Sequence, residues 1–171
     1  LSDLSDLVIR ENCDVGFAVD PDSDRLAIID ENGKPLGEEY TLVLAAAGYL
    51  SQKENSEVLV TNLSSSIALD KLADKYNSTV LRSAVGEINV VNKMVECNSS
   101  FGGEGNGGVI LKDAHLGRDA LVGAALILSY LSHQKTKLSE TYKALPQYVI
   151  VKDKINIKTV SYTHLTLPTS N

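Results

Sequence analysis

Residues that often mark cofactor sites or structural cross-links are scarce in this sequence. It has no tryptophan, one methionine, two phenylalanines and four prolines, and its only cysteines are Cys13 and Cys97. These cysteines form no C-x-x-C motif and belong to no Cys/His cluster. The pattern suggests neither a zinc site nor a disulfide framework, and we expect both thiols to be reduced.

Excess positive charge and long apolar runs are also missing. Sixteen Lys and Arg against 22 Asp and Glu give a net charge of −6, which disfavours nucleic acid and anionic lipid as partners. The longest apolar runs, 41–50 and 120–128, fall short of the roughly 20 residues that span a bilayer. The first residues lack a signal-peptide pattern, so we expect a cytoplasmic protein without membrane or nucleic-acid partners. An anionic sugar phosphate can still bind if a metal ion supplies local positive charge.

The sequence that remains alternates between helical and strand patterns. With 43% hydrophobic residues it is long enough for one domain or two small ones. Apolar periodicity predicts an α/β fold with mixed sheets and flanking helices. The predicted helices are 2–10, 40–50, 67–76, 87–97, 118–131 and 138–145, and the predicted strands are 15–19, 26–29, 58–60, 79–81 and 147–157. Residues 64–66 are candidate helix caps, and the glycine-rich segment 101–109 is predicted to be a loop or tight turn.

Three aspartates follow the first predicted strand at alternating positions. Asp20, Asp22 and Asp24 lie along one loop, where their carboxylates can converge on a hard cation such as Mg²⁺. A solvated acidic turn is the plain alternative. An EF-hand is disfavoured because Arg25 stands where that loop needs glycine, and the D-x-D-x-T loop of dehalogenase-like phosphatases differs because Asp24 stands in place of its threonine.

In its context, VGFAVDPDSDRLAIIDENGKPLGEEY, this loop resembles the D-x-D-x-D-R metal loop of the α-D-phosphohexomutases. The resemblance implies repeated α/β domains of the phosphohexomutase type. It also implies that Asp20, Asp22 and Asp24 hold a Mg²⁺ that contacts the phosphoryl group, with Arg25 as a catalytic residue beside it. A salt bridge from Arg25 to its own loop is the structural alternative.

Two further segments resemble loops of the same family. FGGEGNGG, residues 101–108, resembles the sugar-recognition loop G-E-x-S-G, with Glu104 at the sugar-binding position and Asn106 in place of serine. The V-G-E segment ending at Glu87 resembles a loop that faces the sugar. A glycine-rich hairpin without a ligand and a first-turn helix glutamate are the respective alternatives. Arg118 and Asp119 are interpreted as a helix start.

The resemblance follows the family's order of domains along the chain. It implies that residues 1–39 end domain 2 with the metal loop and that residues 40–160 form domain 3 with the sugar loop, while residues 161–171 form a non-native tail. The family's phosphoserine and phosphate-binding loops have no counterpart here. The implied activity is phosphoryl transfer between the 1- and 6-positions of a hexosamine or hexose phosphate in carbohydrate metabolism.

Within the family, the segment GGEGNGGVI most resembles the phosphoglucosamine mutases, with phosphomannomutase or phosphoglucomutase as the alternative. A non-catalytic module that binds metal or sugar phosphate is the other alternative. This chain is predicted to be inactive by itself, because the phosphorylated serine is absent from it.

Overall fold

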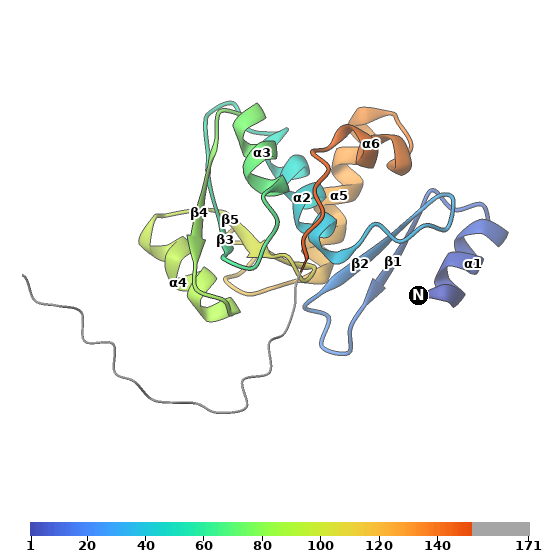
Figure 1. Cartoon of the computed structure of the whole chain (residues 1–171), viewed down its shortest axis with the longest axis horizontal. Helices are drawn as coiled ribbons and strands as arrows, with labels where there is room; N and C mark the ends of the chain where they lie inside the picture. The colour runs from blue at the N-terminus through green and yellow to red at the C-terminus, as the bar shows by residue number, and fades with distance from the viewer. Residues whose placement is uncertain (152–171) are drawn as a thin grey trace, which may run out of the picture.

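The computed structural model describes residues 1–151 (Figure 1). The N-terminal segment forms helix α1 (Ser2–Arg10) and the strands β1 (Val15–Val19) and β2 (Leu26–Asp30), which pair antiparallel as a two-stranded sheet. Val8 of α1 is buried. A Cβ at Gly16 of β1 would lie 2.6 Å from the Val8 side chain, so the helix sits directly on this strand.

A second, four-stranded sheet forms the centre of the remaining chain. Its strands lie in the order β4-β3-β5-β6, with β3 parallel to both β4 and β5 and with β6 antiparallel to β5. Parallel strands present their carboxyl ends at the same edge of a sheet. The elements are α2 (Glu38–Leu50), β3 (Val58–Asn62), α3 (Ala68–Lys75), β4 (Thr79–Ser83), α4 (Glu87–Glu96), β5 (Phe101–Glu104), β6 (Gly108–Leu111), α5 (Ala120–Gln134) and α6 (Leu138–Ala144).

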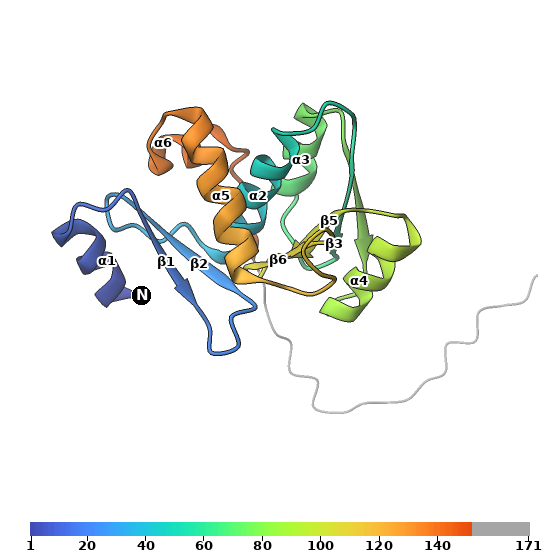
Figure 2. The same ribbon diagram turned by 180° about the vertical axis from the view of Figure 1, so that it is seen from behind.

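Helices cover both faces of this sheet, as the two opposite views show (Figures 1 and 2). Neighbouring strand residues point to opposite faces. Leu59 of β3 therefore joins the larger apolar core with α2, α3 and α5, whereas Val60 joins a smaller core beneath α4 that includes Met94. The fold class predicted from the sequence, α/β with mixed sheets and flanking helices, is confirmed.

Helix α2 is the most enclosed helix of the described chain. Every residue from Tyr40 to Leu50 is buried, because α2 lies between the sheet and helices α3 and α5. Gly48 permits the close approach of α5: a Cβ at this position would lie 2.4 Å from the backbone oxygen of Leu126. The apolar run that is too short for a membrane span is therefore a central core helix. No helix within residues 1–151 has the length and apolar character needed to cross a bilayer.

Side-chain hydrogen bonds help to attach the β1–β2 sheet to the rest of the chain. The hydroxyl of Thr41 donates a hydrogen bond to the backbone oxygen of Leu26 at 2.7 Å. Glu31, which follows β2, accepts hydrogen bonds from both the backbone N–H and the hydroxyl of Ser139 in α6. The Glu31 carboxylate thus satisfies an N–H group at the start of that helix.

The predicted helices are confirmed to within a few residues at their ends, and the first four predicted strands are confirmed as β1 to β4. The prediction of a loop or tight turn over 101–109 is confirmed only for the turn at 105–107, because the residues on either side of it form the strands β5 and β6 of a hairpin. Residues 147–151 form no strand, which contradicts that part of the prediction for 147–157. Residues 152–157 and the proposed tail 161–171 lie outside the described residues. Of the candidate caps, Ser66 accepts a hydrogen bond from the N–H of Ala68 at the start of α3.

Candidate functional site

The acidic loop between β1 and β2 folds around its first aspartate. Asp20 Oδ1 accepts hydrogen bonds from the backbone N–H groups of Asp24 and Arg25, each at 3.1 Å, and Oδ2 accepts one from Arg25 Nε at 2.6 Å. The loop is therefore a tight turn rather than the extended segment expected from the sequence. It nevertheless gathers the predicted ligands, since one carboxylate oxygen each of Asp20, Asp22 and Asp24 lies within 4.8 Å of the others.

The electrostatics of the loop differ between its two less exposed aspartates. At Asp20, burial raises the pKa, but the hydrogen bonds from Arg25 outweigh it and hold the pKa well below its usual value. At Asp24, burial and the neighbouring Asp20 carboxylate raise the pKa above its usual value, against the opposing charge of Arg118. Crowded carboxylates are stabilised by a cation.

The donor set and one unpaired atom fit such a cation. Asp24 Oδ1 is buried and accepts no hydrogen bond from any described residue. Arg25 Nε lies 3.5 Å from this oxygen, beyond good hydrogen-bonding distance. Three carboxylates offer only oxygen ligands, which is the ligand type that Mg²⁺ prefers. The loop therefore fits a hard divalent cation.

Backbone contacts dock the acidic loop against the β5–β6 hairpin and the start of α5. The N–H of Leu26 donates to the backbone oxygen of Gly107 at 3.0 Å, and the N–H of Ala120 donates to that of Ser23 at 3.0 Å. Gly107 has a φ of 90°, and a Cβ there would lie 2.7 Å from the backbone oxygen of Leu26. A glycine is thus required where the sugar loop predicted from the sequence meets the acidic loop.

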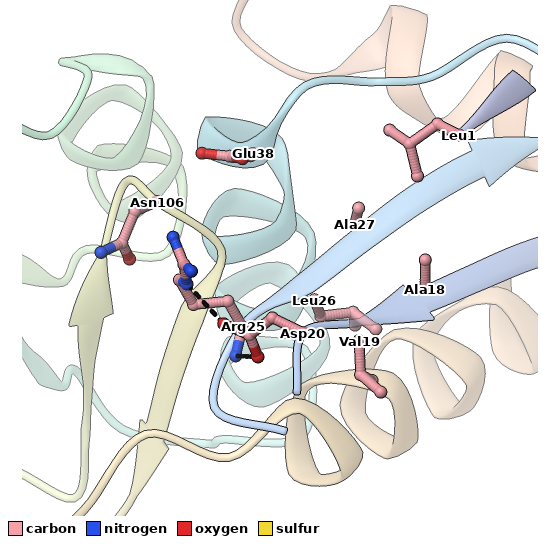
Figure 3. Close-up of a pocket in the computed structure, with 9 residues that line it drawn as sticks. All are labelled: Leu1, Ala18, Val19, Asp20, Arg25, Leu26, Ala27, Glu38 and Asn106. Carbon is pink, nitrogen blue, oxygen red and sulfur yellow. Dashed lines mark hydrogen bonds and ion pairs between the residues drawn. The ribbon is translucent and has the colours of Figure 1, made fainter. Parts of the chain in front are cut away.

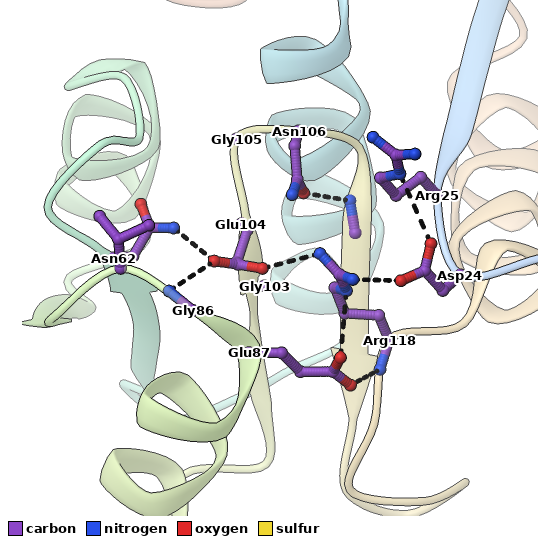
Figure 4. Close-up of polar contacts among 12 residues, drawn as sticks. Asp24, Arg25, Asn62, Gly86, Glu87, Gly103, Glu104, Gly105, Asn106 and Arg118 are labelled. Atoms are coloured by element: carbon purple, nitrogen blue, oxygen red, sulfur yellow. Dashed lines mark hydrogen bonds and ion pairs between the residues drawn. The ribbon is translucent and has the colours of Figure 1, made fainter. Parts of the chain in front are cut away.

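Glu104 ends β5 at the carboxyl edge of the sheet and is only 3% exposed. Its Oε1 accepts hydrogen bonds from Asn62 Nδ2 at 2.6 Å and from the N–H of Gly86 at 3.2 Å (Figure 4). Its Oε2 accepts one from Arg118 Nη1 at 2.8 Å. The end of β3, the loop after β4 and the start of α5 therefore all converge on this one carboxylate.

Arg118 is the residue that joins these parts. Its Nη2 donates a very short hydrogen bond to Asp24 of the acidic loop, and its Nη1 donates to Glu104. On its other side, the backbone N–H of Arg118 donates to Glu87 Oε1 at 2.8 Å, and its Nε lies 3.3 Å from Glu87 Oε2. Figure 4 shows its guanidinium between the three carboxylates.

Sequence reasoning missed this role of Arg118. The prediction of a helix start is confirmed for Asp119, whose side chain accepts hydrogen bonds from the N–H groups of Leu121 and Val122. The arginine beside it instead turns toward the site. Its partner Asp24 is 94 positions away in the sequence, so no local pattern links the two. The sequence offered one weak signal for this role: Arg118 is a cation next to a helix cap in an acidic chain that has a predicted carboxylate site.

The other predicted site residues lie around the same region. Glu87 starts α4 and is turned toward Arg118, as just described. Asn106, in the β5–β6 turn, accepts a hydrogen bond from the N–H of Gly108 at 3.2 Å. Figure 3 shows Asn106 beside Arg25 on the wall of a pocket of about 250 Å³ that also includes Asp20 and Glu38. The structure thus brings every residue predicted for the site to one edge of the molecule.

Comparison with known proteins identifies the family. A family model described as phosphoglucomutase/phosphomannomutase, alpha/beta/alpha domain III, matches residues 28–149. A phosphoglucomutase/phosphomannomutase from Thermococcus kodakarensis is 35% identical, with 92% of this chain matching 34% of that protein. A phosphoglucosamine mutase from Clostridium botulinum is 34% identical over 91% of this chain and 36% of its own length. The chain therefore spans about a third of the length of the curated relatives it matches.

Solved structures share the fold at lower sequence identity. A phosphoglucomutase/phosphomannomutase family protein from Burkholderia thailandensis superposes with a TM-score of 0.74 at 23% identity, covering 87% of this chain and 32% of that one. An N-acetylphosphoglucosamine mutase from Aspergillus fumigatus, solved with glucose 1,6-bisphosphate, gives a TM-score of 0.57 at 15% identity over 76% and 32% of the two chains. The family match and the curated relatives together show that the chain belongs to the α-D-phosphohexomutase family and carries its domain III.

Proposed function

We propose that this chain supplies the metal-binding and sugar-binding loops of a phosphohexose mutase. The complete protein would move a phosphoryl group between the 1- and 6-positions of a hexosamine or hexose phosphate. The observation that carries the proposal is the direct link between the two loops, in which Arg118 joins Asp24 of the acidic loop to Glu104 of the sugar loop. A cation and a sugar bound at these loops would be neighbours.

In this proposal Asp20, Asp22 and Asp24 of the acidic loop would hold Mg²⁺, which would supply positive charge to offset that of the phosphoryl group. Asp20 holds the Nε of Arg25, and both residues line the pocket in Figure 3, which supports a role for the Arg25 guanidinium in binding a phosphate oxygen. Its predicted salt bridge and its catalytic role are thus compatible.

Sugar hydroxyls would be recognised by Glu104, Asn106 and Glu87. An ionised carboxylate has about four lone-pair sites, so Glu104 retains acceptor capacity beyond its three present hydrogen bonds. Because it is only 3% exposed, a sugar hydroxyl can reach it only after small shifts of neighbouring side chains. Asn106 is more accessible and can both donate and accept hydrogen bonds.

We propose glucosamine phosphate as the preferred substrate, with mannose or glucose phosphate second. The residues of the glycine-rich sugar loop, GGEGNGGVI, support this order. We further propose that residues 1–39 close domain 2, in keeping with their separate two-stranded sheet. We also propose a cytoplasmic location, as expected from the sequence.

The test is a coupled assay of the product of the complete open reading frame with Mg²⁺, a trace of sugar bisphosphate and each of three 6-phosphates: glucosamine, mannose and glucose. We expect turnover, fastest with glucosamine 6-phosphate. Asp22→Asn should abolish most of it, whereas Asp6→Asn, an exposed carboxylate on α1, should retain it. Mg²⁺ binding without turnover on any sugar would favour the non-catalytic binding module.

The 171-residue chain provides a second arm of the same assay. We expect it to show no turnover above an Asp20→Ala background, because no phosphorylated serine faces its metal loop. Ser64, Ser65 and Ser66 are poor substitutes: Ser65 and Ser66 are nearly buried, and Ser65 is held by Thr61, Asn62 and Gly105. Turnover by this chain would show that the nucleophile had been misplaced.

A further inference from the structure

One guanidinium lies between three carboxylates that come from three different elements. Arg118 contacts Asp24 of the acidic loop, Glu104 at the end of β5 and Glu87 at the start of α4 (Figure 4). Its side chain is 18% exposed, as is that of Asp24, and the side chain of Glu104 is 4% exposed. The pairs with Asp24 and Glu104 are therefore screened by solvent much less than surface ion pairs are.

The shape of the guanidinium explains how it serves two loops at once. Its two terminal nitrogens point to different partners, with Nη2 donating to Asp24 and Nη1 donating to Glu104. Arginine presents its donors in a rigid planar fork, so moving one carboxylate reorients the group that holds the other. The third carboxylate, Glu87, holds the backbone of Arg118 and fixes the base of the side chain.

The hydrogen bond from Arg118 also orients the carboxylate of Asp24. Its Oδ2 is held by Arg118, whereas its buried Oδ1 accepts no hydrogen bond from the described residues. A carboxylate fixed through one oxygen presents the other in a defined direction, as hydrogen bonds to a metal ligand commonly do. The hydrogen bond from Arg118 thus leaves one oxygen of Asp24 available to a cation.

We propose that Arg118 is a positioning residue that couples cation binding at the acidic loop to ligand binding at Glu104. The inference rests on the proposed function, because it takes Asp20, Asp22 and Asp24 as the cation ligands and Glu104 as a sugar ligand. Coupling between two ligands is reciprocal: a sugar bound at Glu104 changes the affinity for the cation by the same factor as the cation changes the affinity for the sugar. A change confined to Glu104 must then alter cation binding through Arg118.

The experiment is a double-mutant cycle read out as Mg²⁺ affinity by titration calorimetry on the full chain, with the metal alone as probe. Glu104→Gln removes the charge that shares Arg118 with Asp24, so Arg118 should hold Asp24 more tightly and Mg²⁺ should bind more weakly. The same substitution is then made together with Arg118→Met. Through-space effects of the lost charge occur in both backgrounds and cancel in the ratio of the two responses.

We expect the weakening caused by Glu104→Gln to be about fivefold or more larger in the presence of Arg118 than in the Arg118→Met background, the size of a modest coupling. Glu38→Gln is the matched control, since Glu38 lies beside Arg25 in the pocket and belongs to no ion pair with Arg118 among the described residues. Its effect should be equal in the two backgrounds. Equal responses to Glu104→Gln in both backgrounds would overturn the proposal.

Two measurements keep these outcomes distinct. If the unsubstituted chain binds no Mg²⁺, the proposed metal loop fails and the inference fails with it; if it binds Mg²⁺ without coupling, only the inference fails. Circular dichroism reports whether Arg118→Met folds. If it does not, the cycle is run with Arg118→Lys, whose single ammonium group lacks the planar fork of arginine. If Glu104→Gln weakened Mg²⁺ binding as much in that background as with Arg118 present, the proposal would equally be overturned.

Discussion

Replacing Gly48 with alanine should destabilise the chain by forcing α2 and α5 apart. The new Cβ would lie 2.4 Å from the backbone oxygen of Leu126, where ordinary van der Waals contact begins at 3.4 Å, so α5 would have to move by about 1 Å. Overpacking of this kind costs about 1–3 kcal/mol, whereas alanine gains about 1 kcal/mol of helix propensity over glycine. The net loss, up to about 2 kcal/mol, lowers the thermal midpoint by up to roughly 8 °C in a chain of this size.

Gly123 in α5 provides a matched control, because it is also a helical glycine facing the core. A Cβ there would lie 3.2 Å from a methyl group of Val109, a side chain that can shift by a few tenths of an ångström. Gly123→Ala should therefore keep most of the propensity gain, with a midpoint equal to or about 2 °C above that of the unsubstituted chain. Thermal unfolding followed by far-ultraviolet circular dichroism compares the two variants. A midpoint for Gly48→Ala at or above that of Gly123→Ala would refute this view of the helix crossing.

Three other predictions concern the loops and the chain end. Burial raises the pKa of Glu31, but the hydrogen bonds from Ser139 outweigh burial and lower this pKa below its usual value of 4.5. The stability that these hydrogen bonds contribute is therefore present above pH 4.5 and is lost as the pH falls through the pKa of Glu31 in the folded state. Ser139→Ala should cost about 1 kcal/mol at neutral pH in urea unfolding, with the difference shrinking under acid; a constant difference would contradict this assignment. Gly107→Ala should cost about 1–3 kcal/mol, because it combines a positive φ with a contact to Leu26, and an unchanged midpoint would count against the docking of the acidic loop. Deleting residues 161–171 should leave the midpoint unchanged, since their sequence lacks a periodic apolar face; a loss of several degrees would make them part of the native structure.

Local patterns predicted most of the elements because each carries its own signal. The apolar spacing in α1 and the alanine- and leucine-rich run of α2 both define helices without reference to the rest of the chain. The strands β5 and β6 were not predicted, because glycines that the structure uses for close packing read as a loop or turn in the sequence. A Cβ at Gly102 of β5 would lie 2.5 Å from the sulfur of Met94, so α4 can cover this strand only where the side chain is absent.

The site could be predicted only as far as its residues are close in the sequence. Asp20, Asp22 and Asp24 occupy one turn, and the structure places their carboxylates together. The bridge through Arg118 to Glu104 depends on how the sheet brings distant loops to one edge, and composition or periodicity carries no information about it. Roles in binding metal and sugar remain predictions for all of these residues.

Titration of the chain with Mg²⁺ tests the central claim most directly. We expect weak but measurable binding, because the three aspartates supply only part of the coordination that Mg²⁺ requires. Asp22→Asn should weaken this binding by about tenfold or more, since the charge and number of oxygen ligands set the affinity, whereas Asp6→Asn should leave it unchanged. An Asp22→Asn chain that binds Mg²⁺ as tightly as the unsubstituted one would contradict the assignment of the acidic loop as the metal site.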